Sequence, residues 1–386
     1  MKSKITYDLL IIGGGISACV FASKYLQSNS RKKIALIEAG RGLGGRSSTR
    51  ISKKFEGWEL NHGAPNFNIS NSKNNLLLKS YIEELLEKKF IKIDDSDLVF
   101  LDEKLNTESI ENSQFFCGNR YLSLNTMRQL SENIIGFNKI MDKIDFYFET
   151  LIVDLKFNNN QWIISSQNGD EFKSRYIIFT SNLLLHKRSL EILNINQIPL
   201  RNAIPLNNDK SIDLILKFLE KQFFIPRLTF LIYTNKNYTY KDSYSKQYRY
   251  FYLKRNLENK YKFERIIFQQ QNKKLGIVVH TKNTDLINSY IKAKDENIFK
   301  KNISAKFNQL FDGNNSVNLL SGNEKMSIMK WRASQPTGCA VPLSLQFNRK
   351  YRIGFCGDWF EGKGFGRIEG SIMSSLKLVG KFKNLN

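Results

Sequence analysis

Three consecutive glycines between a predicted strand and a predicted helix constrain the fold more than any other feature of the sequence. Residues 5–12 end in an apolar run typical of a strand that is buried on both faces. Gly13, Gly14 and Gly15 follow at once, and residues 16–27 place apolar side chains at helical spacing. This order predicts a dinucleotide site at the start of the helix, although an ordinary α/β protein can contain such a turn without a ligand.

The positions in this turn have different tasks in a dinucleotide site. Gly13 permits a tight turn, and Gly15 lets the backbone approach a pyrophosphate closely. Ile16 and Ser17 begin the helix, where free N–H groups and a partial positive charge face the phosphates. Ala18 occupies the third position, at which a small residue lets the helix pack closely on the strand.

An acidic residue follows the next predicted strand at the spacing that a dinucleotide site requires. Residues 33–37 predict a second strand, which leads into Glu38 and Ala39. An acid about twenty residues beyond the glycine turn accepts the ribose hydroxyls and disfavours a ligand with a 2′-phosphate. The alternative is a capping glutamate in an ordinary α/β protein.

A segment rich in glycine and arginine comes directly after this acid. It spans residues 41–50 and contains Gly44, Gly45, Arg46 and Arg50. The glycines allow close approach of the backbone, and the arginines supply charge and forked donors for phosphate. A dehydrogenase that binds only NAD does not need this segment, so the segment favours another cofactor. The alternative is a solvated basic turn.

The composition allows two domains and leaves the origin of a strong basic charge open. A chain of 386 residues can hold two domains, each with a sizeable core. The formal net charge is +23. Such a charge fits binding to nucleic acid or to an acidic membrane surface. We favour compositional drift instead, because Lys, Asn and Ile are all abundant, as an AT-rich genome would produce.

The cysteines and histidines indicate neither a metal site nor a disulfide framework. The four cysteines are far apart and show no CxxC spacing, and the three histidines form no metal-binding pattern. This usage favours a reducing, cytoplasmic location. Because the glycine turn interrupts the apolar N-terminal stretch, we reject a signal peptide. The sequence has no run of about eighteen apolar residues, so no membrane-spanning helix is expected.

The middle of the chain is basic and rich in tyrosine. Residues 221–274 contain thirteen Lys or Arg, three Asp or Glu and eight Tyr. Such a mixture can bind single-stranded nucleic acid by stacking. A half-buried antiparallel sheet with lysines on its wet face is the favoured interpretation, so we expect no nucleic-acid partner. Aromatic strands are expected over residues 186–323, with a helix at 285–311 packed on them.

Periodic patterns also predict the remaining elements. Helices are predicted at residues 74–89, as the start of a cap over the active site, and at 123–134, with Ser123 as a possible N-cap residue. Strands are predicted at residues 145–153, 161–166, 176–180 and 351–356. After the last strand come Gly357 and Asp358, a glycine-rich turn, and a helix that begins near Arg367 and runs to about residue 381.

Four segments together resemble FAD-dependent oxidoreductases of the amine oxidase superfamily, and among these the renalase-like branch. They are Gly44-Gly45-Arg46-Ser47-Ser48-Thr49-Arg50, Met329-Lys330-Trp331-Arg332, Gly357-Asp358-Trp359 and Arg367-Ile368-Glu369-Gly370. The resemblance covers residues 5–65 and 326–381. Two positions depart from the family pattern. Met329 stands where a histidine is common, and Asn61 replaces an acid ahead of Gly63 and Ala64.

The resemblance implies an α/β fold, in which a Rossmann-like FAD-binding domain of the glutathione reductase type carries an inserted α+β substrate domain built on an antiparallel sheet. The FAD-binding domain would comprise residues 1–73, 119–185 and 326–386, and the substrate or cap domain residues 74–118 and 186–325. The residues expected to bind FAD are Gly13, Gly15, Ile16, Ser17, Glu38, Ala39, Gly45, Arg46, Gly63, Ala64, Ile152, Gly357, Asp358, Arg367 and Ile368.

The resemblance also implies a chemistry. A small reduced substrate, either a reduced nicotinamide of the NAD(P)H type or an amine, would pass hydride to flavin N5, and oxygen would then reoxidise the flavin and give peroxide. Trp331 and His62 are the candidate catalytic residues. The alternatives are core packing for Trp331 and a backbone hydrogen bond for His62. Cys339 resembles cysteines that tether flavin in some relatives, but its neighbours do not match.

Two further functions stay open at this point. Relatives with the same FAD domain include desaturases and isomerases, which would require an apolar tunnel for an apolar substrate. The basic, tyrosine-rich middle would suit a non-enzymatic protein that binds nucleic acid, with an affinity that falls steeply as salt is added.

Overall fold

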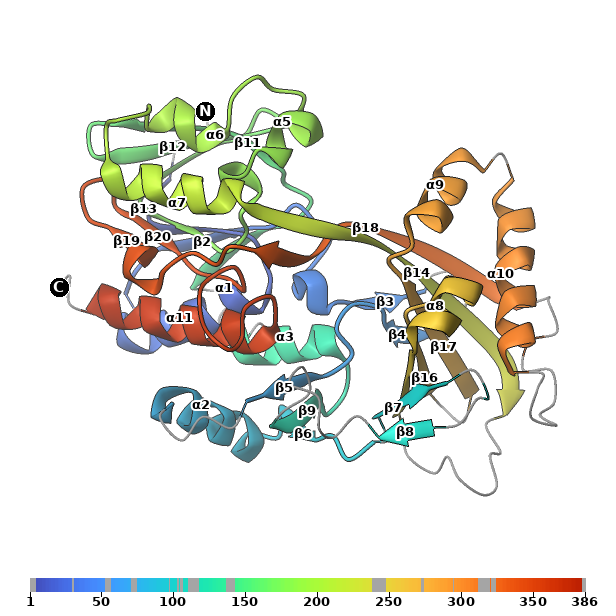
Figure 1. The fold of residues 1–386 in the computed structure, drawn as a ribbon. Helices are drawn as coiled ribbons and strands as arrows, with labels where there is room; N and C mark the ends of the chain where they lie inside the picture. The colour runs from blue at the N-terminus through green and yellow to red at the C-terminus, as the bar shows by residue number, and fades with distance from the viewer. Residues whose placement is uncertain are drawn as a thin grey trace.

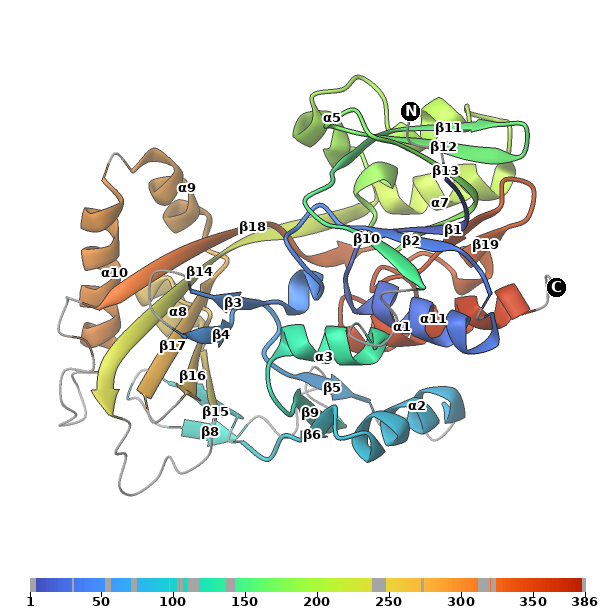
Figure 2. The same cartoon turned by 180° about the vertical axis from the view of Figure 1, so that it is seen from behind.

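A computed structural model describes residues 5–29, 31–52, 57–70, 75–96, 98–102, 104, 107–109, 118–136, 143–237, 248–271, 274–293, 295–311, 320 and 324–383. These residues form two lobes that lie side by side (Figure 1). The first lobe is built on an eight-stranded sheet and the second on a seven-stranded sheet. Both ends of the chain lie in the first lobe (Figure 2).

The eight-stranded sheet has a parallel centre. Its strands follow the order β10-β2-β1-β13-β12-β11, and β20 pairs with β13 and β19. Strands β10, β2, β1, β13 and β20 are parallel, whereas β11, β12 and β19 pair antiparallel with their neighbours. The strands are β1 (Thr6–Ile12), β2 (Ile34–Ile37), β10 (Ile144–Tyr147), β11 (Ile152–Asn158), β12 (Gln161–Ser166), β13 (Glu171–Phe179), β19 (Phe347–Asn348) and β20 (Ile353–Phe355).

Helices cover both faces of this sheet, because side chains of β1 alternate between two hydrophobic cores. Leu9 and Ile11 pack with α1, α2, α3 and α11, whereas Leu10 and Ile12 pack with α6 and α7. The helices are α1 (Ile16–Ser28), α2 (Leu76–Glu87), α3 (Met127–Ile135), α5 (Arg188–Leu193), α6 (Pro199–Ala203), α7 (Lys210–Glu220) and α11 (Ile368–Lys383). Figure 1 shows α7 on one side of the sheet and α1 and α11 on the other.

The seven-stranded sheet is antiparallel except for one pair. Its order is β18-β14-β17-β16-β15-β7-β8, and β15 and β7 are the parallel neighbours. The strands are β7 (Leu98–Leu101), β8 (Thr107–Ser109), β14 (Gln222–Asn237), β15 (Tyr248–Leu253), β16 (Arg265–Gln271), β17 (Lys274–Thr281) and β18 (Lys325–Gly338). Helices α8 (Arg255–Tyr261), α9 (Thr284–Lys292) and α10 (Glu296–Phe311) cover one face.

A short hairpin from the N-terminal part of the chain packs on the other face of this sheet. Strands β3 (Thr49–Ile51) and β4 (Glu59–Asn61) form the hairpin, and Trp58 and Leu60 pack in one core with Leu231 and Val278. A Cβ atom at Gly276 of β17 would lie 2.4 Å from Leu60 Cδ2, so only glycine allows this close approach.

Strands β14 and β18 are the longest strands, with 16 and 14 residues, and they run between the two lobes (Figure 1). They pair antiparallel, with an irregularity between Ile225 and Arg227. Because β18 ends beside the first lobe and begins in the second, it belongs to both. The predicted division into domains stays a prediction.

The expected run of aromatic strands over residues 186–323 is correct only from Gln222 onward. Residues 188–220 instead form α5, α6 and α7. Ile212, Ile215 and Leu219 on one side of α7 are fully buried, so the segment has a helical rather than an alternating pattern. The helix predicted at 285–311 is two helices, α9 and α10, separated near Ala293.

Two other predicted boundaries are wrong. The strand expected at 145–153 is divided, because β10 pairs with β2 and ends at Tyr147, whereas β11 starts at Ile152 and pairs with β12. The helix expected to begin at Ser123 begins at Met127, because Thr126 and Gln129 form a capping box. Ser123 ends β9 (Asn119–Ser123), which pairs with β5 (Phe67–Ile69) and β6 (Ile91–Ile93).

Candidate active site

A cavity of about 520 Å³ is lined by residues of both lobes. Thirteen of the seventeen residues expected at the site line it, namely Gly13, Gly15, Ile16, Ser17, Glu38, Gly45, Arg46, Gly63, Ala64, Trp331, Asp358, Arg367 and Ile368. Four do not, namely Ala39, His62, Ile152 and Gly357. Segments from the two ends of the chain thus meet at one cavity.

The glycine turn has the geometry that a phosphate site requires. Gly13 has φ +104°, and a Cβ atom there would lie 2.5 Å from Thr180 Oγ1. At Gly15 a Cβ atom would meet nothing within 4 Å, so the space beside this residue is open. Gly15 also forms an isolated parallel bridge with Gly44, which brings the arginine segment against the turn. These residues fit the pyrophosphate of a dinucleotide at the start of α1.

Glu38 lines the cavity at the end where the adenosine of a dinucleotide is expected. Its Oε2 accepts a hydrogen bond from the Gly14 N–H at 2.6 Å, and its Oε1 accepts one from the Gly40 N–H at 2.6 Å. Burial raises the pKa of the Glu38 carboxyl, although both N–H donors oppose this shift. The spacing in the sequence indicated a ribose contact but not these two backbone contacts, which hold the carboxylate in place. Ile152, the first residue of β11, is 3% exposed and packs in the hydrophobic core.

Arg46 and Asp358 link the N-terminal and C-terminal parts of the site. The Arg46 guanidinium donates from Nη1 and Nη2 to the two carboxylate oxygens at 2.8 and 2.6 Å, and Nη1 also donates to the Ser334 carbonyl at 3.1 Å. Arg50, the other arginine expected to face phosphate, does not line the cavity and lies near His62. The arginine segment therefore contributes one side chain rather than two.

Backbone segments beside the cavity pack so closely that two of their positions have room only for glycine. A Cβ atom at Gly63 would lie 2.0 Å from the Arg46 carbonyl oxygen, and the Ala64 N–H donates to that oxygen at 3.0 Å. At the C-terminal side Gly357 has φ +151°, and a Cβ atom there would meet the Trp359 ring at 2.1 Å. The turn that follows places the start of α11 at the cavity.

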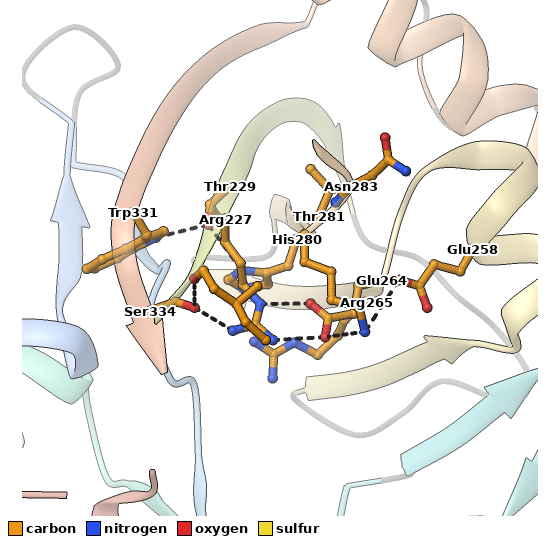
Figure 3. Close-up of polar contacts among 12 residues, drawn as sticks. Arg227, Thr229, Glu258, Glu264, Arg265, His280, Thr281, Asn283, Trp331 and Ser334 are labelled. Carbon is orange, nitrogen blue, oxygen red and sulfur yellow. Dashed lines mark hydrogen bonds and ion pairs between the residues drawn. The ribbon is translucent and has the colours of Figure 1, made fainter. Parts of the chain in front are cut away.

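The second lobe contains a row of four polar side chains, and all of them except Thr229 line the cavity. Tyr252, Arg265, His280 and Thr229 lie directly opposite one another on β15, β16, β17 and β14. Arg265 Nη1 donates to the Tyr252 hydroxyl at 3.1 Å, and Thr229 Oγ1 is 3.1 Å from His280 Nδ1. Figure 3 shows Arg265, His280 and Thr229 with their neighbours.

An ion pair with two hydrogen bonds stands beside this row. Arg227 donates to the two oxygens of Glu264 at 2.8 and 3.0 Å, and its Nη1 donates to Ser334 Oγ at 2.6 Å (Figure 3). Burial by itself would raise the pKa of the Glu264 carboxyl, but Arg227, with Arg265 and Lys282, lowers it to about 2. Glu264 is therefore ionised and fully engaged with cations.

Trp331 lines the cavity, whereas His62 lies against its ring. The Trp331 Nε1–H donates to Thr229 Oγ1 at 3.1 Å, and the ring centroids of Trp331 and His62 are 5.1 Å apart. Burial, with the charge of Arg50, lowers the pKa of His62 to about 4, so its imidazole is neutral. His62 Nε2 is 3.4 Å from Ser48 Oγ, and a hydrogen bond with the Ser48 backbone opposes the lowering of its pKa.

Asn61, the replacement for an acid, has a structural role. Its Oδ1 accepts hydrogen bonds from Thr49 Oγ1 at 2.7 Å and from the Met127 N–H at 3.1 Å. Its backbone N–H and carbonyl pair with the Gln269 side chain at 3.0 and 2.9 Å. Asn61 thereby connects the start of α3 to the second lobe.

Several expected contributors lie away from the cavity. Cys339 is exposed and does not line the cavity. Cys117 lies outside the described residues. No residue of α2 lines the cavity; the helix packs in the core with α1 and α11, so the expected cap over the site is wrong for this helix.

Among the described residues no group of three His, Cys, Asp or Glu side chains can hold a metal ion. A search of the described helices finds none that is long and apolar enough to cross a bilayer.

Sequence reasoning did not single out seven charged or titratable residues of the cavity. They are Arg120, Arg188, Arg227, Tyr252, Glu264, Arg265 and His280. Arg188 of α5 donates to Asn182 Oδ1 at 2.8 Å and lies 4.2 Å above the Phe224 ring; burial and the nearby Arg46 lower its pKa to about 10. The two-residue period of the strands was the available signal: it places Arg265 on the face of Ile267 and His280 on the face of Val278, opposite Ile266 and Val279.

Comparisons with known proteins agree with this architecture. Residues 11–85 match the family model of an NAD(P)-binding Rossmann-like domain. No curated protein matches the sequence. A provisionally named protoporphyrinogen oxidase from Exiguobacterium sp. 255-15 has a similar structure, with a TM-score of 0.64 and 11% identity over 100% of both chains. Wild-type putrescine oxidase bound to putrescine has a TM-score of 0.64 and 10% identity, over 99% of this chain and 100% of that chain.

The fold and the glycine turn thus define a Rossmann-like α/β domain with a second, antiparallel lobe. A triple mutant from a redesign of cofactor binding in putrescine oxidase also matches over the full length of both chains, with a TM-score of 0.64 and 10% identity. The chain has the α/β fold of these oxidases, and the fold expected from the resemblance to the amine oxidase superfamily is confirmed.

Proposed function

We propose that the protein is an FAD-dependent oxidoreductase that accepts hydride from a small reduced substrate, with oxygen as the acceptor and peroxide as the product. One observation carries this proposal: residues 13–17, 44–46, 358–359 and 366–368, which come from distant parts of the sequence, line a single cavity. The similar folds of proteins named as oxidases support it. When bound, the flavin would supply the hydride-accepting atom and the electrons for oxygen.

The chain's own residues would hold and orient the cofactor and the substrate. The open space at Gly15 and the N–H groups at the start of α1 would receive the pyrophosphate, and Glu38 would accept the ribose hydroxyls. The N-terminus of α11, at Arg367 and Ile368, would stabilise negative charge on the reduced cofactor. Trp331 would form an aromatic wall of the substrate space.

The two alternative functions have less support. A desaturase or isomerase of an apolar substrate requires an apolar tunnel, whereas Arg188, Arg227 and Arg265 line this cavity. A nucleic-acid binder would use exposed tyrosines for stacking. Tyr233 and Tyr250 are only 3% and 1% exposed and pack in the core of the second lobe.

The absorbance spectrum of the purified protein tests the proposal first. We expect a flavin spectrum and, after denaturation, release of FAD identified by mass. Anaerobic mixing with reduced nicotinamides and with amines should then bleach the flavin band for one of them. A protein that purifies colourless and does not take up added FAD would contradict the proposal. Gly15→Val, which blocks the expected pyrophosphate space, is the matched variant and should purify without flavin.

A further inference from the structure

The row of polar side chains in the second lobe has hydrogen-bond donors without acceptors. Within the described residues, the bond to the Tyr252 hydroxyl is the single hydrogen bond of the Arg265 guanidinium, and Arg265 has no carboxylate within ion-pair distance. His280 is 2% exposed, lines the cavity, and its Nε2 has no partner among the described residues. Buried donors without partners are costly, so such donors point to a ligand.

The hydrogen bonds of Thr229 decide which nitrogen of His280 carries the proton. An indole N–H can only donate, so the bond from Trp331 Nε1 uses Thr229 Oγ1 as acceptor. The oxygen could accept a second hydrogen bond, but the Thr229 hydroxyl is fully buried, and His280 Nδ1 is the acceptor that the described residues offer to its own proton, so the hydroxyl donates to Nδ1. Burial and the charges of Arg265 and Arg227 lower the pKa of His280, so the neutral ring carries its proton on Nε2. His280 therefore offers an N–H donor.

Among the described residues, this part of the cavity has no acid that is available to a cationic substrate. Glu264 is the acid that the second lobe contributes to the cavity lining, and Arg227 occupies both of its oxygens. Lys282 Nζ lies 3.4 Å from Glu264 Oε1 as a further cation. An amine with a positive charge would thus meet cations and N–H donors, whereas an oxyanion would meet complementary groups.

We infer that the substrate carries an oxyanion, a carboxylate or a phosphate, which binds between the Arg265 guanidinium and His280 Nε2. The inference rests on the proposed function, since it names the substrate class of the proposed oxidoreductase. The glycine turn and the start of α1 offer their own N–H donors to a cofactor pyrophosphate, whereas Arg265 and His280 stand on β16 and β17 of the other sheet. Arg227 and Glu264 are positioning residues that hold the row at the cavity.

Calorimetric titration of the full-length purified protein with benzoate and with inorganic phosphate tests the inference. We expect one of these anions to bind, benzoate for a carboxylate site and phosphate for a phosphate site, whereas neutral benzamide binds at least tenfold more weakly than benzoate. Arg265→Met should weaken the anion at least tenfold, and Arg265→Lys should restore part of the affinity. His280→Gln, which keeps a donor and changes little volume, should weaken it less.

Lys282→Met is the matched control. It removes one positive charge near the row from a side chain that is 40% exposed and does not line the cavity. This variant should bind the anion as the wild type does. Equal loss of binding in Lys282→Met and Arg265→Met, or no binding of either anion to the wild type, would overturn the inference. A failed proposed function is distinguishable, because it gives a colourless protein that does not take up FAD whatever the titrations show.

Discussion

Arg46 and Asp358 lie 312 positions apart in the sequence and form an ion pair with two hydrogen bonds, of 2.6 and 2.8 Å, at the candidate active site. Asp358 is buried, with 6% of its side chain exposed, whereas 40% of the Arg46 side chain is exposed. The pair joins the segment that follows β2 to the segment that precedes α11. It thereby holds together two segments of the first lobe that come from opposite ends of the chain.

Removing Arg46 should destabilise the protein and weaken its hold on flavin. Arg46→Met leaves Asp358 buried without its partner, and we expect a loss of about 1–3 kcal/mol in the free energy of unfolding, measured by urea denaturation. Arg128→Met is the control, because Arg128 and Glu132 form a surface pair on one helix. Its loss should stay below about 0.5 kcal/mol. Equal losses in both variants would show that the Arg46 pair has no special role.

Two substitutions in the glycine turn should separate folding from cofactor binding. Gly13→Ala introduces a Cβ atom at φ +104°, 2.5 Å from Thr180 Oγ1, and should cost about 1–3 kcal/mol of stability in the protein without cofactor. Gly15→Ala places its methyl group in open space and should change that stability by less than about 0.5 kcal/mol. Flavin retention should nevertheless fall for Gly15→Ala. Thermal melts without FAD and FAD titrations measure the two effects, and the reverse order would contradict the assigned register.

Glu38→Ala should weaken FAD binding by about one to three powers of ten. The carboxylate would accept charge-assisted hydrogen bonds from the ribose, which contribute roughly 1.5–3 kcal/mol each before desolvation. Because Glu38 also accepts the Gly14 and Gly40 N–H groups, a modest loss of stability should accompany the effect. Equilibrium dialysis followed by absorbance measures retention. A Glu38→Ala protein that stays fully yellow would show that the carboxylate does not contact the cofactor.

Glu264 should make the stability of the protein depend on acidic pH. Its pKa is about 2 in the folded protein and 4.5 is its ordinary value, a difference worth about 3 kcal/mol. Because the folded value is the lower one, this contribution is complete above pH 4.5 and is lost as the pH falls toward 2. The stability difference between wild type and Glu264→Gln should therefore shrink by about 1 kcal/mol between pH 6 and pH 3.5. Urea denaturation at both pH values checks this, and a difference that does not change would refute it.

Trp331 should matter more for catalysis than His62. Trp331→Ala removes a side chain that lines the cavity, and we expect the rate of flavin reduction to fall by about tenfold or more. His62→Phe keeps a ring against Trp331 at a site that does not line the cavity, so the rate should fall by less than about tenfold. Stopped-flow absorbance with a reductant that bleaches the wild type compares them. A larger loss in His62→Phe would restore His62 as a catalytic candidate.

Local pattern in the sequence was sufficient for the nucleotide-binding half of the fold. The strand, glycine turn and helix over residues 6–28, the strand before Glu38 and the helix after Arg367 all lie where their patterns predict them. These elements are local: each depends on a short apolar period and on glycine positions where a side chain would collide or strain the backbone. The order of these elements along the chain also indicated that they meet at one cavity.

The second wall of the cavity was decided by tertiary structure. Arg265 and His280 are neighbours only because β16 and β17 pair in one particular register, and a shift of either strand by one residue would turn its side chain toward the opposite face. Arg46 likewise meets Asp358, rather than facing phosphate alone, because the C-terminal strand returns beside β13. Side-chain partners separated by hundreds of residues depend on strand register and lobe packing, which leave no periodic signal in the sequence. The sequence by itself therefore determined the Rossmann-like lobe, and tertiary structure alone decided which charged side chains of the second lobe line the cavity.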